Sequence, residues 1–346
     1  MNNISTQIQS KRRLKLHNNK RHPICQLKNI IFDFFEGFEK FDNLDEVVSL
    51  KENFDDLLIP KDHPARSEND TYYVDNNHVL RTHTSAHQNN LMKKGYTKFL
   101  VVGDVYRKDT IDKTHYPIFH QIEGVSILDK EVNALDNLKE TLSKMIEFLY
   151  PNIEYRYLED SFPFTINSIQ AEIKNSNGDW VEILGAGVIH PKILENCGLS
   201  DKTGWAFGFG LDRLVLNFCD ISDIRQLWVE DERFLNQFEN GLTKFIPYSH
   251  HPTISRDISF WVYDYVENDE LLWELHNNFC EIVRNLGNDL SQEIKLLDKY
   301  SRNGRTSLMY RIVYQSYSRS LTNDEINVIH NNIRSFSEKN FKIELR

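Results

Sequence analysis

The chain has 346 residues, of which 40% are hydrophobic and 12% aromatic, so it is long enough for two domains with separate cores. No apolar run approaches the roughly 20 residues that a membrane-spanning helix needs, which excludes a helical span. The net charge is −10, so any RNA contact must come from local basic patches and not from the field of the whole chain.

The cysteines lie far apart in the sequence and form no CxxC pair; they are Cys25, Cys197, Cys219 and Cys280. This spacing indicates neither a zinc site nor a disulfide framework. We expect four reduced, buried thiols in a reducing compartment.

The N-terminal segment is basic, since residues 1–28 carry seven Lys or Arg and no acid. Residues 1–20 in particular have the composition of an organellar transit segment. The same composition suits a disordered basic arm that touches RNA. The sequence leaves both interpretations open, and both place residues 1–20 outside the catalytic fold.

The next segments alternate between helical and strand patterns. Apolar residues recur at helical spacing from His22 to Phe35, and again over 131–149. Residues 98–107 and 119–128 read as two strands of an antiparallel hairpin around a polar loop. A second strand pair and a closing helix follow in 179–218. This order predicts an α+β domain, an antiparallel sheet flanked by helices.

A boundary falls near residues 240–252, which are rich in Gly, Pro, Ser and His. Beyond it the order is strand, helix, strand, strand, helix, strand, which is the ferredoxin-like order. The first of these helices is expected to start near Asn268, and Thr322 with Glu325 has capping-box spacing at the second. We therefore divide the chain into 1–20, 21–243 and 244–346.

The residues best suited to binding a charged ligand lie in residues 103–124, the run GDVYRKDTIDKTHYPIFHQIEG. Arg107 ends a strand, and its planar guanidinium suits phosphate oxygens. Gln121 and Glu123 alternate along the return strand, so they share one face and can converge on an ammonium group. An ordinary exposed hairpin is the alternative, but the whole run resembles motif 2 of class II aminoacyl-tRNA synthetases.

The run FGFGLDR, residues 207–213, is similar to motif 3 of the same enzymes. It is a glycine-rich strand that turns into a helix carrying Arg213, and its small residues let the backbone approach a nucleotide. The pattern is weak alone and strong beside the motif 2 run.

Further runs identify the family; they are NFDDLLIPKDHPAR, RTHTSAHQ, VYRKD, HYPIFHQIEG, FPFT, GWAFGFGLDR, HHPTISRDISFWV and NDLSQEIKLLDKY. Their order resembles single-chain, mitochondrial-type phenylalanyl-tRNA synthetase over about residues 22–346. The resemblance implies a class II catalytic domain followed by a ferredoxin-fold anticodon-binding domain. No Walker, GxGxxG, HExxH or GxSxG motif competes with it.

The resemblance also implies site residues. The catalytic residues would be Arg107, His115 and Arg213. ATP would be bound by Arg107, Thr114, His115, Tyr116, Phe119, Phe207 and Arg213, with adenine between Phe119 and Phe207. The amino acid would be bound by His83, Ser85, Ala86, His87, Gln88, Gln121, Ile122, Glu123, Phe162, Phe164, Glu182 and Ala206. Phe162 and Phe164 would sandwich its ring, and Ala206 would close the pocket; without the resemblance, core packing is the simpler interpretation of Phe162, Phe164 and Phe207.

The implied activity is phenylalanine–tRNA ligase, with ATP and Mg²⁺ as a substrate complex, tRNA(Phe) as partner and no tightly bound organic cofactor. The implied compartment is the mitochondrial matrix, with a plastid-type organelle or the cytoplasm as alternatives. Two rival functions remain open. One is a synthetase for another aromatic amino acid, tyrosine above all; the other is a non-catalytic paralogue that only binds RNA.

Two departures from the family pattern stand out. Motif 1 normally ends in a proline at a dimer interface, whereas the matching stretch here has Glu46 and no proline. This favours a monomer. Asp109 and Asp212 stand where many relatives carry glutamate, which shortens each acidic arm by one methylene.

Overall fold

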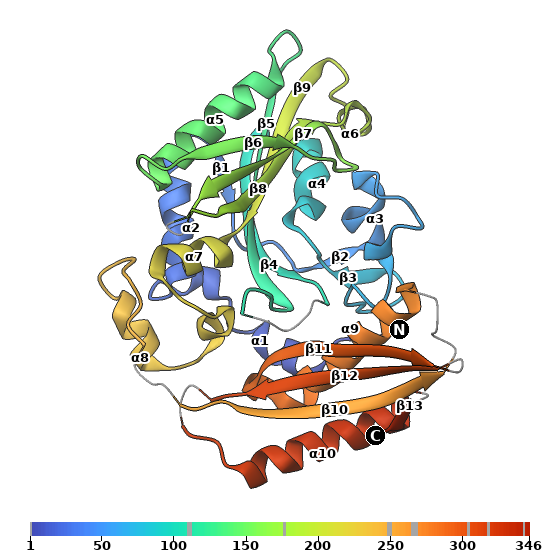
Figure 1. Ribbon diagram of the computed structural model, residues 1–346. Coiled ribbons are helices and arrows are strands. Elements are labelled where there is room, and N and C mark those ends of the chain that lie inside the picture. Colours follow the sequence, from blue (N-terminus) through green and yellow to red (C-terminus); the bar gives the residue numbers. More distant parts are fainter. Residues whose placement is uncertain are drawn as a thin grey trace.

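The computed structural model describes residues 2–108, 113–175, 178–247, 251–263, 269–302, 305–316, 319–341 and 343–346. Two β-sheets organise these residues, one in each half of the chain (Figure 1). No helix in the described ranges combines the length and the apolar character needed to cross a bilayer.

The larger sheet has seven strands in the order β1-β4-β5-β9-β8-β7-β6. Every neighbouring pair is antiparallel except β1 and β4, which run parallel at one edge. This confirms the expected antiparallel sheet, with the addition of the parallel strand β1. The strands are β1 (Glu39–Phe41), β4 (Lys98–Tyr106), β5 (Ile118–Asp129), β6 (Tyr155–Glu159), β7 (Thr165–Lys174), β8 (Trp180–Ile189) and β9 (Lys202–Gly210).

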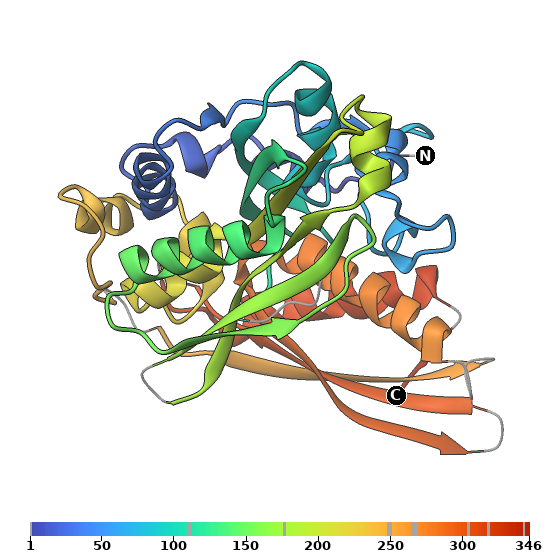
Figure 2. The ribbon, with the colours of Figure 1, turned by 90° about the horizontal axis from the view of Figure 1, so that it is seen from above.

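Helices cover both faces of this sheet (Figure 2). On one side, here named the α2 face, Leu100, Val102 and Ile122 lie in a core with α2 (Pro23–Phe34), α5 (Ala134–Leu149) and α7 (Leu211–Cys219). On the other, named the α4 face, Phe99 and Val125 pack with α4 (Gln88–Lys93) and α6 (Pro191–Asn196). Each buried strand therefore supplies alternate side chains to two different cores.

Shorter elements fill the connections. They are β2 (Val47–Ser49) paired with β3 (His78–Leu80), α3 (Leu50–Asn53), α8 (Glu232–Leu235), and the single turns η2 (Asp55–Leu57), η3 (Pro64–Arg66), η4 (Thr84–His87), η5 (Ile224–Trp228) and η6 (Asn236–Phe238). The expected helix from His22 is confirmed: His22 caps α2 and Pro23 occupies its first position, where no N–H is needed.

The second half folds as the ferredoxin-like order predicts, with strand order β11-β12-β10-β13. Its elements are β10 (Ile254–Tyr263), α9 (Asp269–Gly287), η7 (Asn288–Leu290), β11 (Ser291–Arg302), β12 (Arg305–Tyr314), α10 (Asn323–Asn340) and β13 (Ile343–Leu345). The expected start of α9 at Asn268 lies outside the described residues. Thr322 caps α10 by accepting from the backbone of Glu325, while the Glu325 carboxylate pairs with Arg319.

Polar contacts join the two halves where α9 faces the larger domain (Figure 1). The Tyr72 hydroxyl donates to Glu281 on α9 at 3.3 Å, and Arg284 holds the same carboxylate at 2.8 Å. Arg225, which follows the larger sheet, donates to the backbone oxygen of Ser291 at 2.8 Å. These contacts hold α9 and the start of β11 against the larger domain.

The structure overturns the expectation that residues 1–20 lie outside the fold. Residues Thr6–Lys11 form helix α1, and Leu16–Asn18 form the turn η1. Ile8 is 2% exposed and Leu16 is 7% exposed within the α2-face core. The Lys11 ammonium donates to the backbone oxygen of Trp228 at 3.0 Å. The scattered apolar residues among the basic ones explain why this segment packs.

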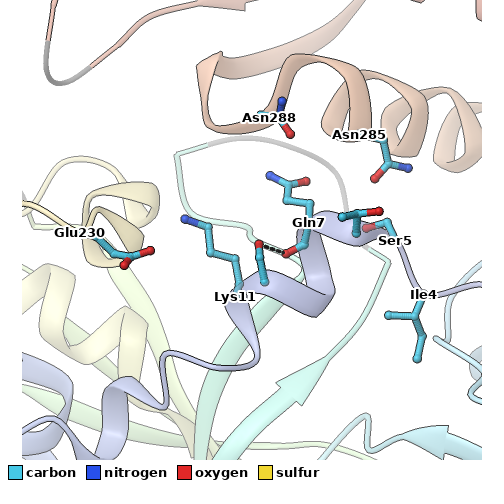
Figure 3. A pocket seen from close by; sticks show the side chains of 9 residues that line it. Ile4, Ser5, Gln7, Lys11, Glu230, Asn285 and Asn288 are labelled. Atoms are coloured by element: carbon cyan, nitrogen blue, oxygen red, sulfur yellow. Dashed lines mark hydrogen bonds between the residues drawn. The ribbon is translucent and has the colours of Figure 1, made fainter.

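A pocket lies between α1 and the C-terminal end of α9 (Figure 3). Most of its lining side chains are polar, and they come from the N-terminal segment, the stretch after η5, and the end of α9 with η7. They are Ile4, Ser5, Thr6, Gln7, Ser10, Lys11, Glu230, Asn285 and Asn288. The N-terminal segment therefore borders the second half of the chain as well as packing on the first.

The cysteines agree in part with expectation. Cys25, Cys219 and Cys280 are buried, whereas Cys197 is partly exposed. The four thiols form no disulfide among the described residues. Burial raises the pKa of the Cys219 thiol to about 11, which keeps it protonated and unreactive.

Replacing Ile8 with Ala should destabilise the larger domain by about 2–4 kcal/mol, because three buried carbons leave a cavity. Thermal unfolding would measure this, with Val328→Ala as a control, since Val328 is an exposed aliphatic residue of α10. Equal unfolding temperatures for the two variants would show that α1 does not contribute to the core.

Candidate active site

The β4–β5 hairpin and β9 place most of the site residues expected on β5 on the α4 face. Phe119, Gln121 and Glu123 alternate along β5, so their side chains share that face. Across the sheet, Gln121 is paired with Gly210 and Glu123 with Gly208. A side chain on Gly208 would begin 3.3 Å from the Gln121 amide nitrogen. Bare glycine therefore leaves room for a ligand beside Gln121 and Glu123.

Glu123 is a buried carboxyl group that forms no ion pair with any residue the structure describes. Its residue is 2% exposed, its Oε2 accepts from the Thr84 hydroxyl at 3.3 Å, and its Oε1 has no hydrogen-bond partner among the described residues. Burial raises the pKa of Glu123 to about 7, and the Ser85 and Thr84 hydroxyls only partly offset this. An unpartnered buried oxygen of this kind favours a ligand that brings a positive charge.

The segment 81–88 lies over the hairpin through η4. The backbone N–H of Thr84 donates to the Gln121 side-chain oxygen at 3.1 Å, which fixes the orientation of the Gln121 amide. Arg81 crosses β4 at Gly103, where a Cβ atom would meet its guanidinium at 1.9 Å. Arg81 also contacts the His87 ring at 2.8 Å. Sequence reasoning missed Arg81 and Thr84, although the glycine inside a buried strand was a signal of close approach.

Two exposed arginines border this region. The Arg107 Nε donates to the backbone oxygen of Thr82 at 2.9 Å, and its guanidinium lies 5.3 Å from the centre of the Phe119 ring. Arg213 is exposed in the first turn of α7. Burial first, and the Arg107 charge second, lower the pKa of His83 to about 3, so His83 is neutral at physiological pH. His115 is partly exposed and contacts Thr114 at 3.1 Å.

Phe162 and Phe164 do not form the expected sandwich. Their rings stack on each other with centroids 5.8 Å apart and an interplanar angle of 14°. A third ring between them would need about 7 Å, since carbon atoms pack at about 3.5 Å. The pair instead forms one wall over Gly185, where a Cβ atom would lie 2.7 Å from the Phe162 ring. Phe164 also packs against the core cluster that contains Ala206.

Three expected ligand-binding residues have side chains on the opposite side of the sheet. Phe207 is 2% exposed and stacks at 5.4 Å on Phe35, the C-cap of α2, so it does not oppose Phe119. Ile122 is fully buried in the same α2-face core. Tyr116 is 7% exposed and stacks on Trp228 at 5.5 Å. Neighbouring strand residues point to opposite faces, so Phe207 cannot share the α4 face with Ala206, nor Ile122 with Glu123.

Of the remaining expected residues, some lie beside Glu123 and others do not. Ser85 lies beside Glu123, whereas Ala86 packs with Val48 and Val79 in a small core cluster. Gln88 is 1% exposed. Glu182 is exposed and stands opposite Glu172 in the sheet, apart from the Glu123 region. Asp109, in the motif 2 loop, lies outside the described residues.

The comparisons with known proteins agree with this architecture. The family described as "tRNA synthetases class II core domain (F)" matches residues 4–238, and "Ferredoxin-fold anticodon binding domain" matches 249–346. The fold and these two matches therefore define a class II aminoacyl-tRNA synthetase, a class that uses ATP and Mg²⁺.

Three relatives show to which family within this class the chain belongs. The "Phenylalanine--tRNA ligase, chloroplastic/mitochondrial" of Arabidopsis thaliana is 45% identical, over 100% of this chain and 83% of its own length. The mitochondrial enzyme of Mus musculus is 37% identical, over 99% and 86%. The alpha subunit of the Clostridium perfringens enzyme is 40% identical, but over only 63% and 69%. The chain belongs to the phenylalanine–tRNA ligase family and shares the full-length organisation of its single-chain organellar members.

Replacing Glu123 with Gln should flatten the pH dependence of stability. The folded pKa of about 7 exceeds the ordinary 4.5, so the wild type loses stability as pH rises from 4.5 to 7, by up to about 1.4 kcal/mol per pH unit. The Glu123→Gln variant carries no such slope, because its amide does not titrate. Urea unfolding between pH 5 and pH 8 measures both.

The control is Glu182→Gln, which removes an exposed carboxyl group from the same sheet. If wild type and Glu123→Gln kept a constant difference across this pH range, Glu123 would not be a buried acid with a raised pKa.

Proposed function

We propose that this chain activates phenylalanine with ATP and transfers it to the terminal adenosine of tRNA(Phe) in mitochondria. Residues 21–243 carry out the chemistry and residues 244–346 contact the anticodon region, while the folded segment 1–20 belongs with the first part. The protein acts as a monomer, because Glu46 occupies the place of the motif 1 proline and pairs within the chain with Arg12 at 2.8 Å.

One observation carries the proposal: the unpartnered Glu123 oxygen beside the bare Gly208 backbone. The ammonium group of an amino acid satisfies that oxygen and supplies the missing charge. Gln121, already oriented by Thr84, lies on the same strand face and binds the same end of the substrate. The stacked rings of Phe162 and Phe164 offer an apolar wall to an aromatic side chain.

Adenylate formation needs positioning and charge stabilisation more than proton transfer. The phenylalanine carboxylate is already a nucleophile; it attacks the α-phosphorus of Mg²⁺-bound ATP, and pyrophosphate leaves. Arg107 stabilises the charge on the α-phosphate, while His115 and Arg213 contact the leaving phosphates. Phe119 receives adenine on the face next to the Arg107 guanidinium. The ribose 2′-hydroxyl of the tRNA terminus then attacks the adenylate carbonyl carbon and releases AMP.

Replacing Arg107 with Ala should lower phenylalanine-dependent ATP–pyrophosphate exchange by about 10² or more, because charge on the α-phosphate loses its nearest donor. The wild type should exchange with phenylalanine far better than with tyrosine. Arg13→Ala, which removes an exposed arginine from the N-terminal segment, is the control. Wild-type exchange by a folded Arg107→Ala enzyme would remove Arg107 from the mechanism. Absence of phenylalanine-dependent exchange in the wild type would refute the function.

Replacing Ala206 with Gly tests the side-chain pocket. Ala206 is 6% exposed and is flanked across the sheet by Val125 and Gly187. Removing its methyl group should cost about 1 kcal/mol of stability and admit para-chlorophenylalanine, while phenylalanine stays a substrate. Pyrophosphate exchange with both amino acids measures this. A folded variant with no gain on the chloro analogue would place the pocket floor elsewhere.

A further inference from the structure

A buried polar cluster lies on the α2 face, directly behind the proposed active site. It consists of the partly exposed Lys15 and the buried residues His17, Asp104, His120 and Asp212, and is here called the His17 cluster. The His17 Nδ1 lies 2.9 Å from one Asp104 carboxylate oxygen, and the His120 Nε2 lies 3.3 Å from the same oxygen. The other His120 nitrogen is 3.1 Å from Asp212. The proposed chemistry uses none of these five side chains.

Each member of the cluster on the sheet or on α7 stands close in sequence to a proposed active-site residue. Asp104 is three residues before Arg107, and Asp212 is adjacent to Arg213. His120 lies between Phe119 and Gln121, with its side chain on the reverse face, and is the direct cross-strand partner of Asp104. The Asp212 carboxylate also accepts from the backbone N–H of His120 at 2.5 Å. Movement of any of these groups therefore moves a substrate-facing neighbour.

The N-terminal segment closes the cluster. Lys15 reaches the second Asp104 oxygen at 3.2 Å and also pairs with Glu46. His17 contacts the backbone oxygen of Asp42 through Nε2 at 3.1 Å, so its two nitrogens join two separate parts of the chain. Lys15 itself adopts a left-handed backbone conformation, with φ of 43°. A strained backbone at this position is consistent with a side chain held by its partners.

The spacing of the cluster has two physical explanations. The His17 Nδ1, an Asp104 oxygen and the His120 Nε2 all lie within 4.8 Å of one another, which suits three ligands of a metal ion. Against a divalent ion stand the Lys15 ammonium at the second Asp104 oxygen and the buried Arg81 guanidinium, whose Nε donates to the Asp104 backbone oxygen. A further double charge beside these cations would be costly in a dry site.

Charge balance favours protons over a metal ion in this site. The His120 Nδ1 is in hydrogen-bond contact with Asp212 at 3.1 Å, whereas the His120 Nε2 faces Asp104 at 3.3 Å without hydrogen-bond geometry. An imidazolium is therefore attracted to both carboxylates. Burial is the largest influence and lowers the pKa of His120, but attraction and hydrogen bonding from Asp212, with attraction from Asp104, outweigh it and leave the pKa raised. The Trp228 ring stacks on His120 at 5.2 Å and keeps water from it.

We infer that Lys15 and His17 are positioning residues for catalysis. They act through Asp104, His120 and Asp212. These three residues hold Arg107, at the end of β4, in place relative to Arg213 on α7. This inference rests on the proposed function, since it assigns the two arginines to ATP. The N-terminal segment then contributes to catalysis as well as to the core of the catalytic domain.

The first experiment compares Lys15→Met and His17→Gln with Lys20→Met, which removes the same charge from an exposed site in the same segment. We expect kcat for pyrophosphate exchange to fall by about 10- to 100-fold in the first two variants, because small displacements of positioned groups are costly. KM for phenylalanine should stay close to that of the control. The unfolding temperature should fall, because the buried Asp104 carboxylate loses a partner, so kcat is compared per folded molecule. Variants that lose only stability, with kcat unchanged per folded molecule, would overturn the inference.

The second experiment uses Asp212→Asn and Asp212→Glu. The amide cannot balance the imidazolium, so Asn should reproduce the loss in kcat, whereas Glu keeps the charge and should restore at least part of it. Equal activity of the two variants would contradict a positioning role. Elemental analysis of the purified wild type should find no stoichiometric zinc; one zinc per chain would show that the cluster binds a metal and overturn the hydrogen-bonded arrangement.

ATP affinity by calorimetry separates this inference from the proposed function, because binding needs no turnover. If the wild type fails to activate phenylalanine, the function is wrong, and the inference is then judged by ATP binding alone. Lys15→Met and His17→Gln should weaken ATP binding relative to Lys20→Met. Equal affinities in all three variants would refute the link between the N-terminal segment and the two arginines.

Discussion

The catalytic half of the molecule depends on the alternation of side chains along β5 and β9. On β5 this alternation sends Phe119, Gln121 and Glu123 to one face and His120 and Ile122 to the other. The same strands therefore carry the proposed ligand-binding side chains on one side and pack against helices on the other. A register shift of one residue would exchange the two sets, so the packing of the α2 face also protects the composition of the site.

The buried acidic groups on the two faces of the sheet have different partners. On the α2 face, the Asp104 and Asp212 carboxylates share His120, and Lys15 supplies a further cation. On the α4 face, the groups that hydrogen-bond Glu123 within the described part of the chain are hydroxyls, and burial raises its pKa. The carboxylates on the α2 face are balanced by cations within the protein, although the His17 Nδ1, one Asp104 oxygen and the His120 Nε2 lack a hydrogen-bond partner among the described residues. A cluster balanced in charge is suited to rigidity, whereas a single acid without a cation is suited to an arriving one. The contrast distinguishes a supporting group from a ligand-binding group without reference to other proteins.

The sequence predicts most of the fold because its periodicities are local. The hairpin at 98–128, the helix that starts near His22, and the ferredoxin-like order of the second half all follow from patterns a few residues long. β6 and β7 escaped prediction; for β7 the register against β8 is irregular between Ile166 and Ile169 and again after Ala171. The role of residues 1–20 was also missed, because composition outweighed the few apolar positions that anchor the segment.

Site residues could be predicted from the sequence only where their positions follow from alternation along one strand. Glu123 and Gln121 follow from alternation, but Phe207 was assigned by motif resemblance although its neighbour Ala206 occupies the α4 face. The stacking of Phe162 on Phe164 depends on the loop before β7 and has no sequence period. His17 meets Asp104 across 87 positions of the chain, and nothing local in the sequence brings them together.

The burial of Ile8 and Lys11 has a consequence for proteolytic processing. A peptidase that cut among the basic residues 11–15 would detach Ile8 from the core and Lys11 from Trp228, and would leave a cavity beside η5. Removal of these residues would therefore take from the catalytic domain both the buried Ile8 side chain and the Lys11 contact.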